Sequence, residues 1–429
     1  MKEEIYFFLG NVFHHLSQAL PLYRRLGGTF VVVTEQVYSE CKKVGLPVMM
    51  LDRLVGDDDN SEFMPHNIPL TIDFLNRRSG WIFFFESYNI VPALYSLKKV
   101  MLFHGISLKT GWFLPSRVAL LNCYDFITSL GPHQESLLLE RAVDSRKLWQ
   151  IGQTKNDDVI NTSDKDVSSA KRKIKSFYPG KYKKVFTYFP TFFGDTTVDS
   201  LGLEVAKNID SDFLLIVKLH GSTPQYIVDL YRELSQSRSN IVVYGGSFEG
   251  SVNNLELLRG SDAFFLDVSS MTFEALLTKK PLIFLINQKN LQFYKLIDEV
   301  FKLSVHIDDT NISELNGMIS DIKTDKKKYE QAWQVVSKKV YYNLDGDAVD
   351  CFCSKMNSIS EPRDDSSWVE TIASVKRNER LIANLQQTAN EARYLSYKTY
   401  ELLTNLQHET PPEKGISHLL DNFMKRFVK

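Results

Sequence analysis

Short, continuous apolar runs alternate with amphipathic stretches along most of this 429-residue chain. The runs are rich in Val, Ile and Phe and are apolar on both faces, which is typical of parallel strands covered by helices on each side. The strands predicted in this way are residues 5–12, 29–34, 81–87, 99–104, 125–131, 184–190, 213–220, 240–246, 263–269 and 281–287. Strands that alternate with helices indicate open, doubly wound α/β sheets.

Two polar segments predict the domain boundaries. Residues 163–184 are polar, basic and poor in large apolar side chains, and residues 359–368 have the composition of a linker. A chain of this length is expected to form two domains with a smaller appendage. We therefore predict a Rossmann-like domain at 1–162, a second Rossmann-like domain at 163–358 and a helical extension at 359–429.

The predicted extension carries two helical patterns. Residues 376–408 show a weak apolar seam with alternating three- and four-residue spacing, a candidate surface for pairing subunits in a homo-oligomer. Residues 415–429 place an apolar stripe beside basic side chains; the stripe is Ile416, Leu419, Leu420, Phe423, Met424 and Phe427. Such a helix either docks on the body of the protein or lies in a membrane interface, and the sequence leaves both open.

Composition excludes several classes of function. The net charge of -1 and the pI near 6.8 give no electrostatic reason to expect a nucleic-acid partner. The four cysteines form neither a disulfide framework nor a metal-ligand pattern, which favours reduced thiols in the cytosol. No apolar segment approaches the roughly 18 to 20 residues that span a bilayer. We expect a cytoplasmic protein, with a peripheral position on the inner face of the plasma membrane as the alternative.

Two predicted strands end in the same pair of residues. His104 follows the apolar run of MLFHGISLK (101–109), and His220 follows that of LLIVKLHGS (214–222). Ligands of doubly wound sheets bind beyond the carboxyl ends of the strands, where both histidines are expected to lie. A histidine near its ordinary pKa suits proton transfer at neutral pH, so both are predicted to be catalytic. The neighbouring candidates for donor binding are Gly105, Lys109, Lys218 and Gly221.

Two further segments supply candidates for binding phosphate. In LDVSSMTFEALL (266–277) a predicted strand ends at an aspartate, and two serines open the next helix. Such serines either cap the helix or present hydroxyl and N–H groups to a phosphate. YFPTFF (188–193) places a threonine at another strand end. The donor-binding candidates in these segments are Thr191, Asp267, Ser269, Ser270 and Glu274.

Other polar residues receive weaker assignments. Glu86 follows WIFFF and is either an acidic group of the site or a loop residue, while His14 and His15 either contact an acceptor or lie on a helix surface. The chain has no GxGxxG or Walker sequence, so it lacks the fingerprints of nicotinamide binding and ATP hydrolysis. No cluster has metal-ligand spacing, so no metal site and no required cofactor are assigned. A divalent cation could still neutralise a pyrophosphate.

Several of these segments, taken together, resemble the motifs of a known family. HGISLK (104–109) is similar to the HGTPLK motif of the CDP-glycerol glycerophosphotransferases, the teichoic acid primases and polymerases. The remaining family motifs have counterparts in the same order, up to about residue 350: IGQTKND, YFPTFF, IVKLHG, LDVSSMTFEALLTKKPLIFL and NLDGDAVDCF. Single motifs are unspecific, whereas their order together is moderately specific.

The resemblance implies a GT-B fold and the transfer of glycerol phosphate or ribitol phosphate from a CDP-activated donor. The acceptor would be a hydroxyl group of a cell-surface glycan, such as teichoic acid or capsule polysaccharide, or of a lipid-linked precursor. His104 would act as the general base, CMP would leave, and His220 would stabilise charge on the phosphoryl oxygens.

The remaining candidates take roles in donor binding by the same resemblance. Ser269 and Ser270, assisted by Thr191, would hold the pyrophosphate. Asp267 and Glu274 would orient the loop or the nucleotide.

The chain departs from the family motifs at several positions. Ser107, Gln153, Lys155, Gly221 and Val268 replace residues of the family pattern. Lys155 matters most, because it stands where the family has an arginine, and an ammonium binds phosphate differently from a forked guanidinium.

Two alternatives remain open. A GT-B glycosyltransferase would keep the fold and use a nucleotide-sugar donor. A non-catalytic, membrane-associated assembly protein would keep the fold without the chemistry.

Overall fold

The computed structural model describes residues 3–10, 15–50, 68–88, 90–106, 120–191, 196–221, 223–244, 252–322 and 326–359. The chain divides into two compact units, Met1–Glu361 and Pro362–Lys429, and every described residue lies in the first. Residues 360–429 hold both patterns of the predicted extension and lie outside the described residues, as do His14 and Lys109. No helix among the described residues combines the length and the apolar character needed to cross a bilayer.

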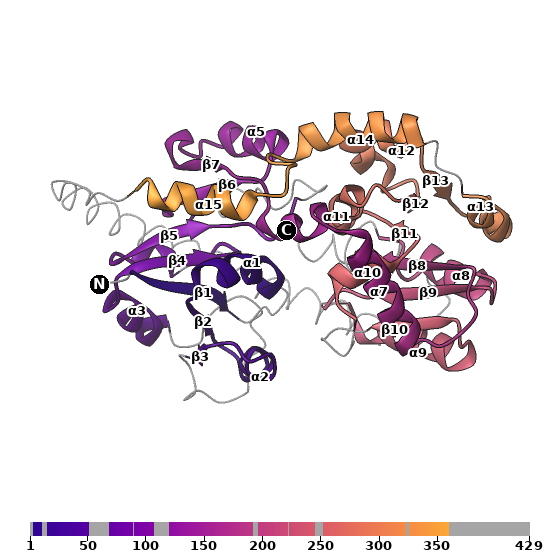
Figure 1. The fold of residues 1–429 in the computed structure, drawn as a ribbon, viewed down its shortest axis with the longest axis horizontal. Helices are drawn as coiled ribbons and strands as arrows, with labels where there is room; N and C mark the ends of the chain where they lie inside the picture. Colours follow the sequence, from indigo (N-terminus) through magenta and orange to yellow (C-terminus); the bar gives the residue numbers. More distant parts are fainter. Residues whose placement is uncertain are drawn as a thin grey trace, which may run out of the picture. The chain divides into compact units, whose positions relative to one another are not determined.

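The first half of the described chain forms a seven-stranded parallel sheet in the order β3-β2-β1-β4-β5-β6-β7 (Figure 1). Its strands are β1 (Glu4–Gly10), β2 (Thr29–Val32), β3 (Val48–Met50), β4 (Gly80–Phe84), β5 (Leu97–Met101), β6 (Phe126–Ser129) and β7 (Leu148–Gln150). Its helices are α1 (Leu16–Leu26), α2 (Glu35–Lys43), α3 (Ile68–Asn76), α5 (Pro132–Glu140) and α6 (Asp157–Ile160), with short 3₁₀ turns η2 (Val91–Ala93), η4 (Ser145–Lys147) and η5 (Thr154–Asn156).

Both faces of this sheet are buried. Successive side chains of a strand point to opposite faces. Accordingly Phe7 and Phe83 belong to one buried cluster, whereas their neighbours Phe8 and Phe84 belong to another. The continuous apolar runs of the sequence therefore correspond to strands covered on each side, as predicted.

The second half forms a six-stranded parallel sheet in the order β10-β9-β8-β11-β12-β13. Its strands are β8 (Lys184–Phe189), β9 (Phe213–Lys218), β10 (Ile241–Tyr244), β11 (Ala263–Leu266), β12 (Leu282–Leu285) and β13 (Val305–Ile307). Its helices are α7 (Asp164–Phe177), α8 (Leu201–Asn208), α9 (Gln225–Ser237), α10 (Asn254–Gly260), α11 (Met271–Leu277), α12 (Asp298–Phe301), α13 (Leu315–Ser320) and α14 (Lys326–Val340), with 3₁₀ turns η6 (Leu291–Ile297) and η7 (Ile312–Glu314). Two parallel sheets with helices on both faces confirm the predicted fold class.

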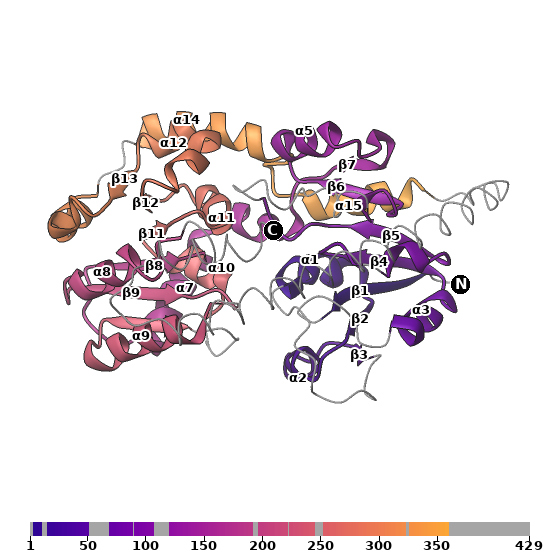
Figure 2. The same ribbon diagram turned by 180° about the vertical axis from the view of Figure 1, so that it is seen from behind.

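The polar segment at the predicted domain boundary forms helix α7. The Ser163 side chain accepts from the backbone N–H of Asp166 while the Asp166 side chain accepts from that of Ser163, so a capping box starts the helix. Ala170 and Ile174 are its buried residues, and α7 packs beside α10 (Figure 1, Figure 2). The basic residues that marked this segment as a boundary lie on the opposite, solvated side of an amphipathic helix.

Helix α15 (Ala348–Asn357) returns to the first sheet. It lies in the range that the sequence assigns to the second domain, yet Phe352 is buried with the side chains of β1 and β4. The ring centroids of Phe352 and Phe83 lie 5.4 Å apart, and those of Phe352 and Trp149 lie 5.6 Å apart. The chain therefore contributes its last described helix to the core of its first sheet.

A single carboxylate caps α15. Asp157, in the motif IGQTKND, accepts hydrogen bonds from the backbone N–H groups of Ala348 at 3.0 Å and Val349 at 2.8 Å. These two N–H groups begin the helix and have no partner within it. Two of the family-like segments thus meet in a structural contact.

Replacing Asp157 with alanine is expected to lower the free energy of unfolding by about 0.5 to 2 kcal/mol, because the cap of α15 is lost. Urea unfolding of both proteins measures the change. Asp350→Ala is the matched control, since Asp350 lies on the same helix with an exposed side chain. Equal stability of the two variants would contradict the capping role.

Candidate active site

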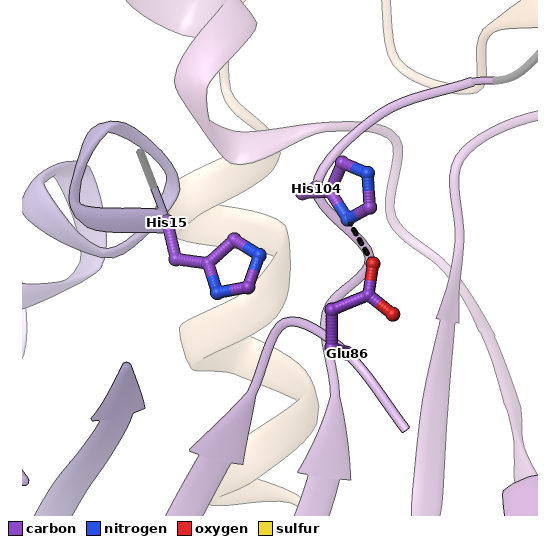
Figure 3. Close-up of side chains that lie close together, drawn as sticks. All are labelled: His15, Glu86 and His104. Carbon is purple, nitrogen blue, oxygen red and sulfur yellow. Dashed lines mark ion pairs between the residues drawn. The ribbon is translucent and has the colours of Figure 1, made fainter. Parts of the chain in front are cut away.

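Three polar side chains lie beyond the carboxyl ends of neighbouring strands in the first sheet. His15 precedes α1 after β1, Glu86 follows β4 by two residues, and His104 follows β5 by three. The strand order reverses between β1 and β4, and such a switch point is where doubly wound sheets bind ligands. Figure 3 shows the three side chains gathered at this place.

Glu86 and His104 form an ion pair. The Glu86 Oε1 atom lies 2.9 Å from Nδ1 of His104 (Figure 3), and the main-chain oxygen of Phe85 lies 3.3 Å from the same nitrogen. Burial lowers the pKa of His104, but the Glu86 carboxylate and the Phe85 carbonyl outweigh it, so the pKa is raised above its ordinary value. His104 is therefore a stronger base than a solvated histidine.

The main-chain oxygen of His104 is held from three sides. It accepts hydrogen bonds from Gln18 Nε2 at 2.6 Å, Gln153 Nε2 at 3.1 Å and Lys155 Nζ at 3.2 Å. Gln18 lies on α1, while Gln153 and Lys155 come from the segment around η5. The backbone of the predicted base is thus fixed independently of its side chain.

Lys155 links this backbone to the second sheet. Its ammonium group forms an ion pair with Glu274 on α11, and the two side chains are only 13% and 9% exposed. Glu274 was predicted to orient the loop or the nucleotide, and the structure shows its carboxylate engaged by Lys155. The lysine that replaces the family arginine therefore joins the His104 loop to α11.

The loop that follows His104 also approaches the start of α11. A Cβ atom added to Gly105 would lie 3.7 Å from Cβ and 3.9 Å from Oγ of Ser270. Ser270 is exposed, whereas Ser269 is buried and its Oγ accepts from the backbone N–H of Met271 at 3.3 Å. Of the two predicted phosphate-binding serines, Ser269 thus accepts from the first N–H group of α11, and Ser270 presents its hydroxyl beside Gly105.

The pKa of the second predicted catalytic histidine, His220, is shifted in the opposite direction from that of His104. Burial, the charge of His104 and that of Lys218 lower the pKa of His220 to about 4. Burial also lowers the pKa of Lys218, whose ammonium group lies 5.8 Å from the centre of the Tyr244 ring, and Gly221 is exposed. His220 is neutral at physiological pH.

Asp267 organises the loop after β8. One carboxylate oxygen accepts from the backbone N–H of Thr191 at 2.8 Å, and the other accepts from the N–H and hydroxyl groups of Thr197 at 3.3 and 3.4 Å. Asp267 is fully buried. It therefore shapes the loop that carries Thr191 rather than presenting a carboxylate at the surface.

Sequence reasoning missed parts of this arrangement. Gln18 and Gln153 were not predicted to support His104, because a glutamine carries no signal of its partner before the fold is known. The sequence predicts Glu86 only as either an acidic group of the site or a loop residue, and does not pair it with His104. The fold also brings one ligand atom each of His15, Glu86 and His104 within 4.8 Å of one another, a grouping that could hold a metal and that no spacing in the sequence indicates.

Comparison with known proteins gives one family match. A model described as CDP-Glycerol:Poly(glycerophosphate) glycerophosphotransferase matches residues 81–354, which is more than half of the chain. No curated protein sequence matches.

Several solved structures share the fold. The wall teichoic acid polymerase TagF, soaked with CDPG, has a TM-score of 0.60 and 13% sequence identity, covering 83% of this chain and 88% of its own. HepE from Anabaena, in complex with UDP-glucose, has a TM-score of 0.52 and 11% identity, covering 83% of this chain and 99% of its own. At these identities the likeness concerns the fold, and it confirms the predicted GT-B-like architecture.

Proposed function

Because the chain belongs to the CDP-glycerol:poly(glycerophosphate) glycerophosphotransferase family, we propose that it transfers glycerol phosphate or ribitol phosphate from a CDP-activated donor. The acceptor in this proposal is a hydroxyl group of a cell-surface glycan or of a lipid-linked precursor. The chain is a CDP-glycerol glycerophosphotransferase-like transferase. Beyond this class of enzyme, we propose the phosphopolyol donor, the class of acceptor and the residues that take part in the transfer.

His104 takes the proton of the acceptor hydroxyl in this reaction. As the proton moves to Nε2 of His104, the acceptor oxygen forms a bond to the β-phosphorus of the donor. The bond from this phosphorus to the bridging oxygen breaks, and CMP leaves with the bonding electrons. A positioned general base of this kind contributes about 10²- to 10⁴-fold to the rate.

His220 stabilises the transferring group without carrying charge. Since its pKa is about 4, the imidazole is neutral at physiological pH and donates its N–H to a phosphoryl oxygen. Ser270 provides a hydroxyl beside Gly105 for the same phosphate group. The observation that best supports the proposal is this approach of the His104–Gly105 loop to Ser270, because it brings the base next to the predicted donor site.

The proposal is tested by incubating the purified full chain with CDP-glycerol, CDP-ribitol and a panel of nucleotide sugars. Release of CMP from a CDP-polyol is the expected result. Release of a nucleotide from a sugar donor alone would establish the glycosyltransferase alternative instead. The absence of turnover with every donor, together with binding to another protein that depends on residues 360–429, would establish the assembly protein.

Replacing His220 with alanine is expected to lower kcat for CMP release by about 10²-fold, because a preorganised hydrogen-bond donor to the transition state is lost. His220→Asn keeps a side-chain N–H group and should retain more activity. Both variants are measured by steady-state kinetics between about pH 6 and 9, because His220 is neutral in this range. A variant that changes only KM would contradict a role in the transition state.

A further inference from the structure

We propose that Glu86 is a positioning residue of the transfer reaction, which fixes the His104 tautomer in which Nδ1 carries the hydrogen and Nε2 serves as the base. The inference rests on the proposed function and deepens it, because it assigns the group that prepares the base. Glu86 acts through His104 and makes no contact with substrate in this proposal.

The tautomer follows from the two oxygens that face Nδ1. Glu86 Oε1 lies 2.9 Å from this nitrogen and the Phe85 main-chain oxygen lies 3.3 Å from it. A carboxylate and a carbonyl can only accept hydrogen bonds, so Nδ1 must donate. A neutral imidazole carries one hydrogen, which leaves the lone pair on Nε2. The fold thereby selects the nitrogen that can accept a proton.

The structure holds Glu86 rigidly enough for this role. Its main-chain oxygen accepts from the Tyr124 hydroxyl at 2.9 Å, and its side chain is only 16% exposed. Glu86 and His104 follow the paired strands β4 and β5, whose register includes Phe84 opposite Met101. Two adjacent strands of a rigid sheet thus set the distance between the carboxylate and the imidazole.

A carboxylate at this place also stabilises the product of proton transfer. When Nε2 accepts the acceptor's proton, His104 becomes an imidazolium, and the adjacent negative charge lowers its free energy. The Phe85 main-chain oxygen also favours this charge, whereas the other ionisable groups near His104 do not. Lys155, from η5, lowers the pKa of His104, and His15 and His220 add no negative charge. Glu86 is therefore the acidic group that compensates for burial here.

A metal ion is the competing explanation for the grouping of His15, Glu86 and His104. Two histidines and a glutamate are a donor set that zinc accepts, and the three ligand atoms lie within 4.8 Å of one another. A metal shared with Glu86 would need the lone pair of Nδ1, the ring nitrogen beside the carboxylate, whereas this nitrogen faces two acceptors and carries hydrogen. The observed hydrogen bonds thus favour the positioning role over ligation.

The test uses Glu86→Gln in the full chain, with the pH profile of CMP release as the readout. Loss of the carboxylate should move the acid limb of the profile to lower pH, because the His104 pKa falls. The plateau rate should fall at least about 10-fold, since the amide no longer enforces the tautomer. Glu204→Gln is the matched control, because it removes one charge from an ion-paired surface glutamate on α8.

An unchanged acid limb in Glu86→Gln would overturn the proposal. So would a stoichiometric metal in the purified wild-type protein whose removal by EDTA abolishes activity and whose retention depends on His15. Glu86→Asp keeps the negative charge on a shorter side chain, so it should keep part of the upward shift of the His104 pKa. This variant replaces Glu86→Gln in the test if Glu86→Gln does not fold.

A second measurement separates this inference from the proposed function. ¹⁵N-labelled histidine reports the tautomer and the pKa of His104 without any donor, and His104→Asn assigns its signals. The hydrogen on Nδ1 in the wild type, and a lower His104 pKa in Glu86→Gln, are expected even if no donor is turned over. A hydrogen on Nε2 in the wild type would refute the positioning role, whatever the reaction is.

Discussion

His104→Ala is expected to lower the rate of CMP release by about 10²- to 10⁴-fold, because the acceptor hydroxyl loses the base that takes its proton. The side chain is 33% exposed, so its removal should leave the fold intact. Single-turnover assays separate this loss from weaker donor binding. His133→Ala is the control, since His133 lies in the first turn of α5, outside the grouped site residues. Similar activity of the two variants would refute the assignment of His104.

The pH dependence gives the same prediction a second test. A base acts only when neutral, so the rate should rise with pH through the pKa of His104. Burial lowers the pKa of His104, but the Glu86 carboxylate and the Phe85 carbonyl together raise it by more than burial lowers it. The acid limb should therefore lie above the ordinary histidine pKa of 6.5. The pKa of His220 is about 4, and its titration therefore falls well below this limb. An acid limb near pH 4 would instead identify His220 as the base.

The strands of both sheets could be predicted because their signal is local. Each long apolar run became a strand, since burial on both faces demands continuous apolar sequence. The sequence reading missed β3, β7 and β13, which are three residues long. All three strands lie at sheet edges, where a short segment needs few apolar residues. The return of α15 to the first sheet was missed because it depends on contacts between distant segments.

The candidate site could be predicted only as a set of residues beyond strand ends. His104, His220 and Ser270 could be proposed because each follows a predicted strand. The pairing of Glu86 with His104 could not be read from the sequence, since it depends on β4 and β5 being neighbours. Periodicity identifies strands, whereas strand order decides which loops meet.

Several family-like positions have structural roles. Asp157 caps α15, and Asp267 holds the backbone of the loop after β8. The ammonium group of Lys280 donates to main-chain oxygens at the end of α10, namely those of Leu258, Arg259 and Ser261. Such a cation stabilises the C-terminal end of a helix. A motif residue can therefore serve the framework of the site as well as the reaction.

Among the residues of this framework, Lys155 is the one whose replacement is expected to lower the stability of the protein most. It replaces the family arginine, and its ammonium group contacts both the main-chain oxygen of His104 and the carboxylate of Glu274. Taking the lysine away would leave a largely buried carboxylate without its counter-ion. A charge in this situation is costly because the protein interior solvates it poorly.

Lys155→Met is expected to lower the free energy of unfolding by about 3 to 5 kcal/mol, the range for a buried ion pair that loses one partner. Urea unfolding measures the change. Lys207→Met is the matched control, because the Lys207–Glu204 pair is about half exposed and should contribute at most about 1 kcal/mol. The double variant Lys155→Met with Glu274→Gln should recover much of the loss, since the stranded charge is gone.

These stability changes also separate two roles of Lys155. If the lysine matters only through Glu274, the double variant should regain wild-type transfer activity together with stability. Because Lys155 also donates to the main-chain oxygen of His104, we expect stability to return while activity stays low. Full recovery of both would show that Gln18 and Gln153 are sufficient to hold the base. Equal stability of Lys155→Met and Lys207→Met would instead show that the Lys155–Glu274 pair is solvated.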